Sequence, residues 1–174
     1  MWWKPSNAST LEYDVSAMTS QLFVTDVIIY CGMAVLSNGT VGAEPTRPGA
    51  RPGSDDWGRP ELCPAAIASA VSAGLGVQVI LEGRATAESG GPLAAALSRG
   101  GATVGSEALR FLSMLDPQGH VRAINIDWER GGSTWTPESA LVDNFMAAFA
   151  SSIRPSGLGL TVCAPGVGPT KPFV

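Results

Sequence analysis

The fold is decided by one stretch of sequence, Val121-Arg122-Ala123-Ile124-Asn125-Ile126-Asp127-Trp128-Glu129. Polar and apolar residues alternate in its second half, and on a β-strand alternate side chains share a face. One face would then carry an amide and two carboxylates: Asn125, Asp127 and Glu129. The other face would be apolar: Ile124, Ile126 and Trp128. We therefore predict a strand with one face against the core and one polar face.

The sequence on both sides of this strand alternates between buried strands and amphipathic helices. Apolar, β-branched runs predict strands at 23–31, 76–82, 121–129 and 158–164. Apolar residues at helical spacing predict helices at 9–22, 61–74, 105–115 and 137–153. This order implies an α/β fold with a parallel sheet, either a doubly wound sheet or a (β/α) barrel. A helix precedes the first long strand, so we expect Trp2-Trp3 to be the tail of an earlier strand.

One long connection interrupts this alternation. Residues 42–60 contain eight Gly or Pro and no apolar period. They predict either a loop above a rigid scaffold or a mobile insertion. Asn38-Gly39, just before it, lies between apolar residues and is a hairpin signal.

Composition excludes several classes of function. The 174 residues include 11 Lys and Arg against 15 Asp and Glu, a net charge of −4 without a basic cluster, which disfavours nucleic-acid binding. No stretch approaches the about 20 apolar residues of a membrane span. The cysteines, Cys31, Cys63 and Cys163, are odd in number and widely spaced, so we expect buried free thiols and neither a metal site nor a disulfide framework. The sequence contains no phosphate-binding loop and no nucleophile elbow, so it gives no sign of a cofactor or of a serine hydrolase.

The polar face of the stretch 121–129 predicts acid chemistry. Ligands of α/β proteins bind at the carboxyl ends of the strands, where Asp127 and Glu129 would lie. Two neighbouring carboxylates do not ionise together easily, so Glu129 would retain a proton near neutral pH, as a general acid requires. Alternatively, the two carboxylates face solvent or cap the next helix.

The run Asn125-Ile126-Asp127-Trp128-Glu129 resembles the strand-four signature of family 18 glycoside hydrolases, the chitinases and their relatives, D-G-x-D-x-D-x-E. Three further segments resemble the second, third and fifth strands of that family in order: 27–32, 76–83 and 160–165. The resemblance implies one domain over 1–174, an incomplete (β/α)8 barrel of the TIM type with roughly strands 1–5. The chain is shorter than the about 200–250 residues that a closed barrel needs.

The resemblance also implies a reaction, the hydrolysis of chitin, a β-1,4-linked N-acetylglucosamine polymer, by substrate-assisted retaining catalysis. Glu129 corresponds to the acid that protonates the glycosidic oxygen, and Asp127 to the carboxylate that orients the acetamido group of the substrate. Asn125 stands where the family has an Asp and can hydrogen-bond Asp127 without sharing a proton. The chain departs from the family at three more places: Arg122, Ala123 and Leu81-Glu82-Gly83-Arg84. We expect Glu82 to be solvated.

Aromatic side chains would stack on sugar rings. Trp57 and Trp135 are candidate platforms, although each could equally pack on the domain. Tyr30 either reaches the site or belongs to the core, and Trp128 is expected in the core. His120 begins the predicted strand at the end opposite the carboxylates and is not expected to be catalytic.

Two other functions remain open. One is a carbohydrate-binding chitinase-like protein without turnover, and the other is an unrelated open α/β domain, which a reversal in strand order would reveal.

An incomplete barrel would associate through its open sheet edges. The family would fit a secreted or endomembrane protein, although Met1-Trp2-Trp3-Lys4-Pro5 shows no signal peptide; the sequons Asn7-Ala8-Ser9 and Asn38-Gly39-Thr40 matter only if the chain is secreted.

Overall fold

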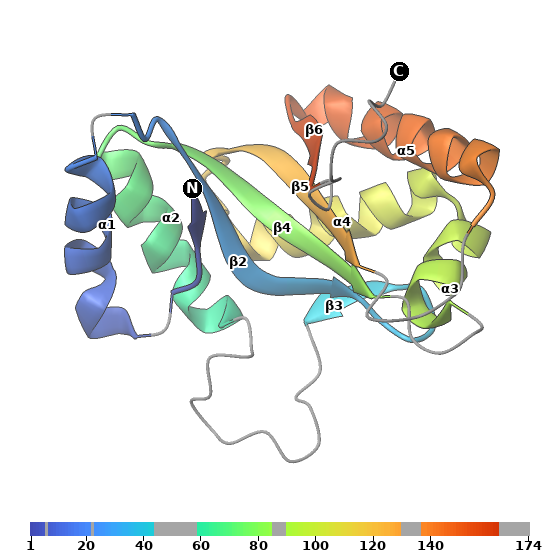
Figure 1. Cartoon of the computed structure of the whole chain (residues 1–174), viewed down its shortest axis with the longest axis horizontal. Helices are drawn as coiled ribbons and strands as arrows, with labels where there is room; N and C mark the ends of the chain where they lie inside the picture. Colours follow the sequence, from blue (N-terminus) through green and yellow to red (C-terminus); the bar gives the residue numbers. More distant parts are fainter. Residues whose placement is uncertain (6, 22, 44–58, 85–89, 130–136, 164–174) are drawn as a thin grey trace, which may run out of the picture.

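A parallel sheet forms the centre of the molecule (Figure 1). The computed structural model describes residues 1–5, 7–21, 23–43, 59–84, 90–129 and 137–163, without the side chains of Arg84 and Glu129. Five parallel strands lie side by side in chain order: β1 (Trp2–Trp3), β2 (Asp26–Val35), β4 (Gly76–Arg84), β5 (Val121–Glu129) and β6 (Gly159–Val162). The short strand β3 (Val41–Ala43) pairs antiparallel with β2. The predicted α/β class with a parallel sheet is confirmed, and the order shows no reversal.

The described residues include five α-helices and three short 3-10 turns. The helices are α1 (Leu11–Thr19), α2 (Cys63–Ser72), α3 (Gly91–Arg99), α4 (Gly101–Leu115) and α5 (Ser139–Ile153). The turns are η1 (Ala8–Thr10), η2 (Pro60–Leu62) and η3 (Arg154–Ser156). In Figure 1, α1 and α2 lie together at one end of the sheet, and α3, α4 and α5 lie at the other. No helix in the described ranges is long and apolar enough to span a membrane.

All five helices pack against the same face of the sheet. One apolar cluster joins residues of every helix with alternate residues of the three central strands: Val27, Ile29, Cys31, Val77, Val79, Leu81, Ile124 and Ile126. Each of these strand residues is fully buried. Burial of such side chains stabilises a fold by roughly 1.5–3 kcal/mol each. The residues between them therefore lie on the opposite face.

Most predicted elements exist, with shifted ends. The strand 121–129 has the predicted bounds, and Trp2-Trp3 pairs with β2 as expected. The Asn38-Gly39 hairpin is confirmed, because Val35 pairs with Val41 across it. The strand predicted at 23–31 begins at Asp26 and continues to Val35. The helix α3 was not predicted, because it lies in a Gly-rich segment and has only nine residues.

The prediction of free thiols is wrong for two of the three cysteines. Cys31 of β2 and Cys63, the first residue of α2, form a disulfide with a Cα–Cα distance of 5.6 Å, and both are fully buried. They are 32 residues apart in sequence, so the chain-entropy account gives about 3–4 kcal/mol of stabilisation. The spacing of cysteines along the chain could not show this pairing, because it is the packing of α2 on β2 that brings the two residues together. Cys163 is free and half-buried.

Two glycines allow α4 and α5 to pack closely. A Cβ atom on Gly101 would overlap the carbonyl oxygen of Phe145 and lie 2.7 Å from the backbone nitrogen of Phe149. A Cβ atom on Gly105 would overlap the Ser152 hydroxyl, which is the end of a rotatable side chain. The helix backbones therefore tolerate no side chain at residue 101, whereas residue 105 meets a movable group.

We expect Gly101→Ala to lower the free energy of unfolding by about 3 kcal/mol, because backbone atoms must move apart. Gly105→Ala should lower it by about 1 kcal/mol. Adding Ser152→Ala should restore the free energy of unfolding of the Gly105→Ala variant but not that of the Gly101→Ala variant, as measured by urea denaturation. Equal losses, or equal rescue, would contradict the packing described.

Candidate functional site

Polar side chains gather on the face of the sheet that the helices leave uncovered. We call this surface the polar face; its residues are Tyr30, Gln78, Glu82, Asn125, Asp127 and Thr161. They come from four neighbouring strands, and Cys163 follows directly after the last. Because all four strands are parallel, Glu82 and Asp127 lie at the same edge of the sheet, toward the carboxyl ends of β4 and β5, where α/β proteins bind ligands. Tyr30 lies near the middle of β2.

A chain of hydrogen bonds crosses three of these strands. Asn125 Nδ2 donates to Thr161 Oγ1 at 2.7 Å, and Thr161 Oγ1 donates to Gln78 Oε1 at 2.7 Å. The Cys163 thiol donates to Asn125 Oδ1 at 2.7 Å. Asn125 is only 3% exposed, so both ends of a buried amide are satisfied, as buried polar groups require. The bonds that the structure describes for Asn125 go to residues in and after β6.

Glu82 is buried, and the expectation that it would be solvated is wrong. It is 5% exposed, and Tyr30 Oη donates a hydrogen bond to its Oε2 atom. Tyr30 therefore reaches the site, which decides between the two positions considered for it. Lys4 Nζ lies 5.2 Å from the centre of the Tyr30 ring, a cation–π distance. Sequence reasoning missed the burial of Glu82 because its neighbours on the sheet, Asp127 and Tyr30, are far from it in the chain.

Glu82 and Asp127 are direct neighbours across β4 and β5. Their Cα atoms are partners in the parallel register, and adjacent strands lie about 4.8 Å apart. Both side chains lie on the polar face, and Asp127 is half-buried. The two carboxylates therefore come from adjacent positions on the same face of the sheet.

The pKa of the Cys163 thiol depends on the charge at this site. Burial raises the pKa of the Cys163 thiol, and the negative charge of Asp127 raises it further. The hydrogen bond to Asn125 acts in the opposite direction on this pKa. The Asp127 carboxylate therefore lies near enough to Cys163 to disfavour a thiolate there.

The remaining predicted residues are placed as follows. Glu129 is the last residue of β5, in register with Arg84, but its side chain lies outside the described residues. Trp57 and Trp135 also lie outside them. Trp128 packs under α5, with its ring 4.9 Å from that of Phe145, which confirms its place against the core.

His120 lies beyond the amino end of β5, at the opposite end from Asp127. Its Nδ1 atom is 3.4 Å from Asp116 Oδ1, and the other oxygen of Asp116 accepts from the Val121 backbone at 2.7 Å. The two residues thus belong to the turn that begins β5. Among the described residues, no group of three or more His, Cys, Asp and Glu could hold a metal ion.

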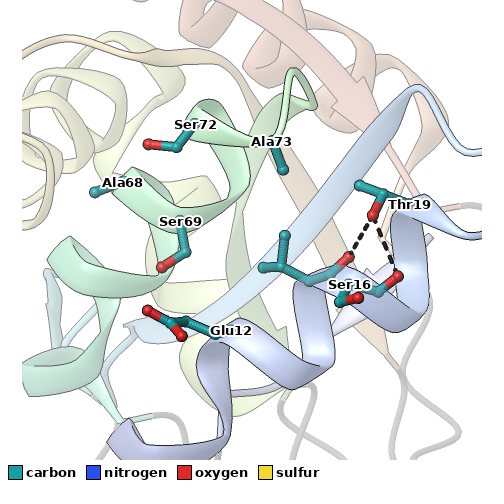
Figure 2. A pocket seen from close by; sticks show the side chains of 8 residues that line it. Glu12, Ser16, Thr19, Ala68, Ser69, Ser72 and Ala73 are labelled. Atoms are coloured by element: carbon teal, nitrogen blue, oxygen red, sulfur yellow. Dashed lines mark hydrogen bonds between the residues drawn. The ribbon is translucent and has the colours of Figure 1, made fainter.

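A separate groove lies between α1 and α2, on the helical side of the molecule. It has a volume of about 510 Å³, and Figure 2 shows Glu12 and Ser16 on the α1 side and Ser69 and Ser72 on the α2 side. Thr19, at the end of α1, also lines the groove and donates to the carbonyl oxygens of Val15 and Ser16 at 3.1 and 3.2 Å. Small residues and a single carboxylate line this groove, so the polar face is the better candidate for chemistry.

Comparison with known proteins finds no family model, no curated protein and no solved structure that is significantly similar to this chain. The interpretation of the site therefore depends on the chemistry and placement of its own residues.

Replacing Asp127 by Asn should lower the pKa of the Cys163 thiol, because the substitution removes a nearby negative charge. The pH dependence of iodoacetamide alkylation, measured with the disulfide intact, follows this pKa directly. Asp143→Asn makes the same change at an exposed site on α5 and should leave the profile unchanged. A profile that stays fixed or moves upward in Asp127→Asn would contradict the placement of Asp127.

Proposed function

We propose that this protein is a glycoside hydrolase of the chitinase type, acting on β-1,4-linked N-acetylglucosamine polymers. The observation that supports it most is the run from Asn125 to Glu129. It forms the end of a parallel strand, with Asn125 and Asp127 on the polar face and Glu129 at the last position. This is where the resemblance to the chitinases puts the acid and the carboxylate that assists the substrate.

The arrangement of the sheet supports the same proposal. Strands in chain order with all helices on one face are what the first part of a (β/α)8 barrel requires, because each crossover adds the next strand on the same side. We propose that β1, β2, β4, β5 and β6 are the first five strands of such a barrel. The polar face would then be its inner wall.

In the proposed reaction Glu129 donates its proton to the glycosidic oxygen, and the bond from that oxygen to the anomeric carbon breaks. The acetamido oxygen of the same sugar attacks the anomeric carbon and forms an oxazolinium ion, which Asp127 orients and stabilises. Water then opens this ring while Glu129 takes up the proton of the water. Neither step needs a metal or an organic cofactor.

Glu82 and Tyr30 would assist Asp127 in this reaction. Asn125 is an amide with both ends hydrogen-bonded, so it cannot share a proton with Asp127. Glu82 lies beside Asp127 in register and is held by the Tyr30 hydroxyl. We propose that Glu82, from the neighbouring strand, is the second carboxyl group of the site.

A carbohydrate-binding protein without turnover is the second candidate. The amide at Asn125 favours it, because a site without an acid at that position still offers hydrogen bonds to a sugar. Calorimetry with chito-oligosaccharides, together with a product assay, separates the two candidates. Heat of binding without product would favour the binding protein.

We expect Glu129→Gln to reduce the release of product from a chito-oligosaccharide by roughly 10²- to 10⁴-fold, because the variant has no proton to donate. Binding measured by calorimetry should change little. Glu138→Gln, the same substitution at the exposed N-cap of α5, serves as the control and should retain full activity. If the unsubstituted protein releases no product at any pH, or Glu129→Gln releases it equally fast, hydrolysis through Glu129 is excluded.

We also propose that the chain associates with itself through its sheet edges. Among the described residues, β6 pairs only with β5, and Val162 in β6 is 53% exposed. An unpaired strand edge of this kind accepts another strand. Val162→Lys should shift the protein toward monomer in light-scattering chromatography, whereas Met114→Lys, at an exposed site on α4, should not. A wild-type protein that is a uniform, cooperatively unfolding monomer would contradict this proposal.

A further inference from the structure

Two short segments of the chain adopt the same local structure around an asparagine. Asn38 Oδ1 accepts hydrogen bonds from the Thr40 backbone nitrogen at 3.0 Å and from Thr40 Oγ1 at 2.7 Å. Asn7 Oδ1 accepts the equivalent bonds from the Ser9 backbone nitrogen at 3.0 Å and from Ser9 Oγ at 3.1 Å. In both segments a hydroxyl two residues later is therefore held against the amide of the asparagine.

Both asparagines are available to a modifying enzyme. Their side chains are exposed, and the Nδ2 atom of each makes no hydrogen bond to any described residue. The sequences Asn38-Gly39-Thr40 and Asn7-Ala8-Ser9 have the form Asn-x-Ser/Thr, with no proline at the middle position. This is the acceptor sequence for N-linked glycans in secreted proteins.

The hairpin that carries Asn38 has room for a glycan. Gly39 has a φ of 78° and faces α3, where a Cβ atom would lie 2.6 Å from the carbonyl carbon of Ala95. Asn38 is exposed on the same turn, so its side chain is not buried against α3. The turn is also fixed by the bond from the Leu36 backbone nitrogen to the Thr40 carbonyl oxygen at 2.8 Å.

The disulfide gives an independent reason to expect such a modification. Cys31 and Cys63 are fully buried and bonded to each other. Structural disulfides form in oxidising compartments, such as the lumen of the secretory pathway, and are rare in the cytosol. The disulfide is therefore consistent with a chain that folds in such a compartment.

We propose that the protein is an N-linked glycoprotein with Asn38 as an acceptor and Asn7 as a second acceptor. In the transfer step a bond forms between the amide nitrogen and the anomeric carbon of an oligosaccharide carried on a polyprenyl pyrophosphate. The bond from that carbon to the pyrophosphate oxygen breaks, the pyrophosphate leaves with the electron pair, and the amide nitrogen loses one proton. A membrane-bound oligosaccharyltransferase supplies the donor, and this chain supplies only the acceptor.

The test is mass spectrometry of the protein purified from its native cells, before and after treatment with peptide N-glycosidase. We expect glycans on Asn38 and Asn7, with conversion of each residue to Asp when the enzyme removes the sugar. Alkylation before and after reduction should show Cys31 and Cys63 paired in the same sample. An unmodified Asn38, or three free thiols in the native protein, would overturn the proposal.

Variants expressed in a eukaryotic secretory pathway show whether the hydroxyl is responsible. Asn38→Gln and Thr40→Val should each abolish modification at residue 38, whereas Thr40→Ser should retain it. Thr40→Val keeps Asn38 itself, so a glycan that remains on Asn38 in this variant would contradict the role of the hydroxyl. These outcomes are independent of hydrolytic activity and therefore of the function proposed above.

Discussion

Burial of alternate strand residues beneath the helices is the constraint on which the other features of this molecule depend. Val27, Val79 and Ile124 lie with their neighbours in one apolar cluster that every helix joins. A strand that fixes one face in this way also fixes the other, because successive side chains point to opposite sides. The residues between the buried ones, among them those of the polar face, therefore lie on the opposite side of the sheet.

The polar face is consequently under a second constraint. Its polar side chains are partly or fully removed from water, so each needs a hydrogen-bond partner. Asn125 finds partners in Thr161 and Cys163, and Glu82 finds one in Tyr30. These bonds connect four strands, so the network that a ligand would meet is also a network that holds the strands in register.

A disulfide and a close helix–helix contact, each between residues far apart in sequence, hold the helical layer. The disulfide between Cys31 and Cys63 ties β2 to the start of α2. Gly101 allows the backbones of α4 and α5 to touch near Phe145 and Phe149. Both devices position helices over the sheet, and neither involves the polar face directly, so stability and site chemistry can be varied separately by mutation.

Features that depend on local periodicity were predictable from the sequence. It predicted β5 to its exact bounds, the α/β class, the hairpin at Asn38-Gly39 and the core position of Trp128. The contacts between residues of different strands, by contrast, became visible in the folded chain alone. The burial of Glu82 beside Asp127, the partners of Asn125 and the pairing of Cys31 with Cys63 all depend on it. This difference arises because the period of a strand or helix is set by neighbouring residues in the chain. Register and burial are instead set by the lengths and positions of other strands and helices, which no short segment contains.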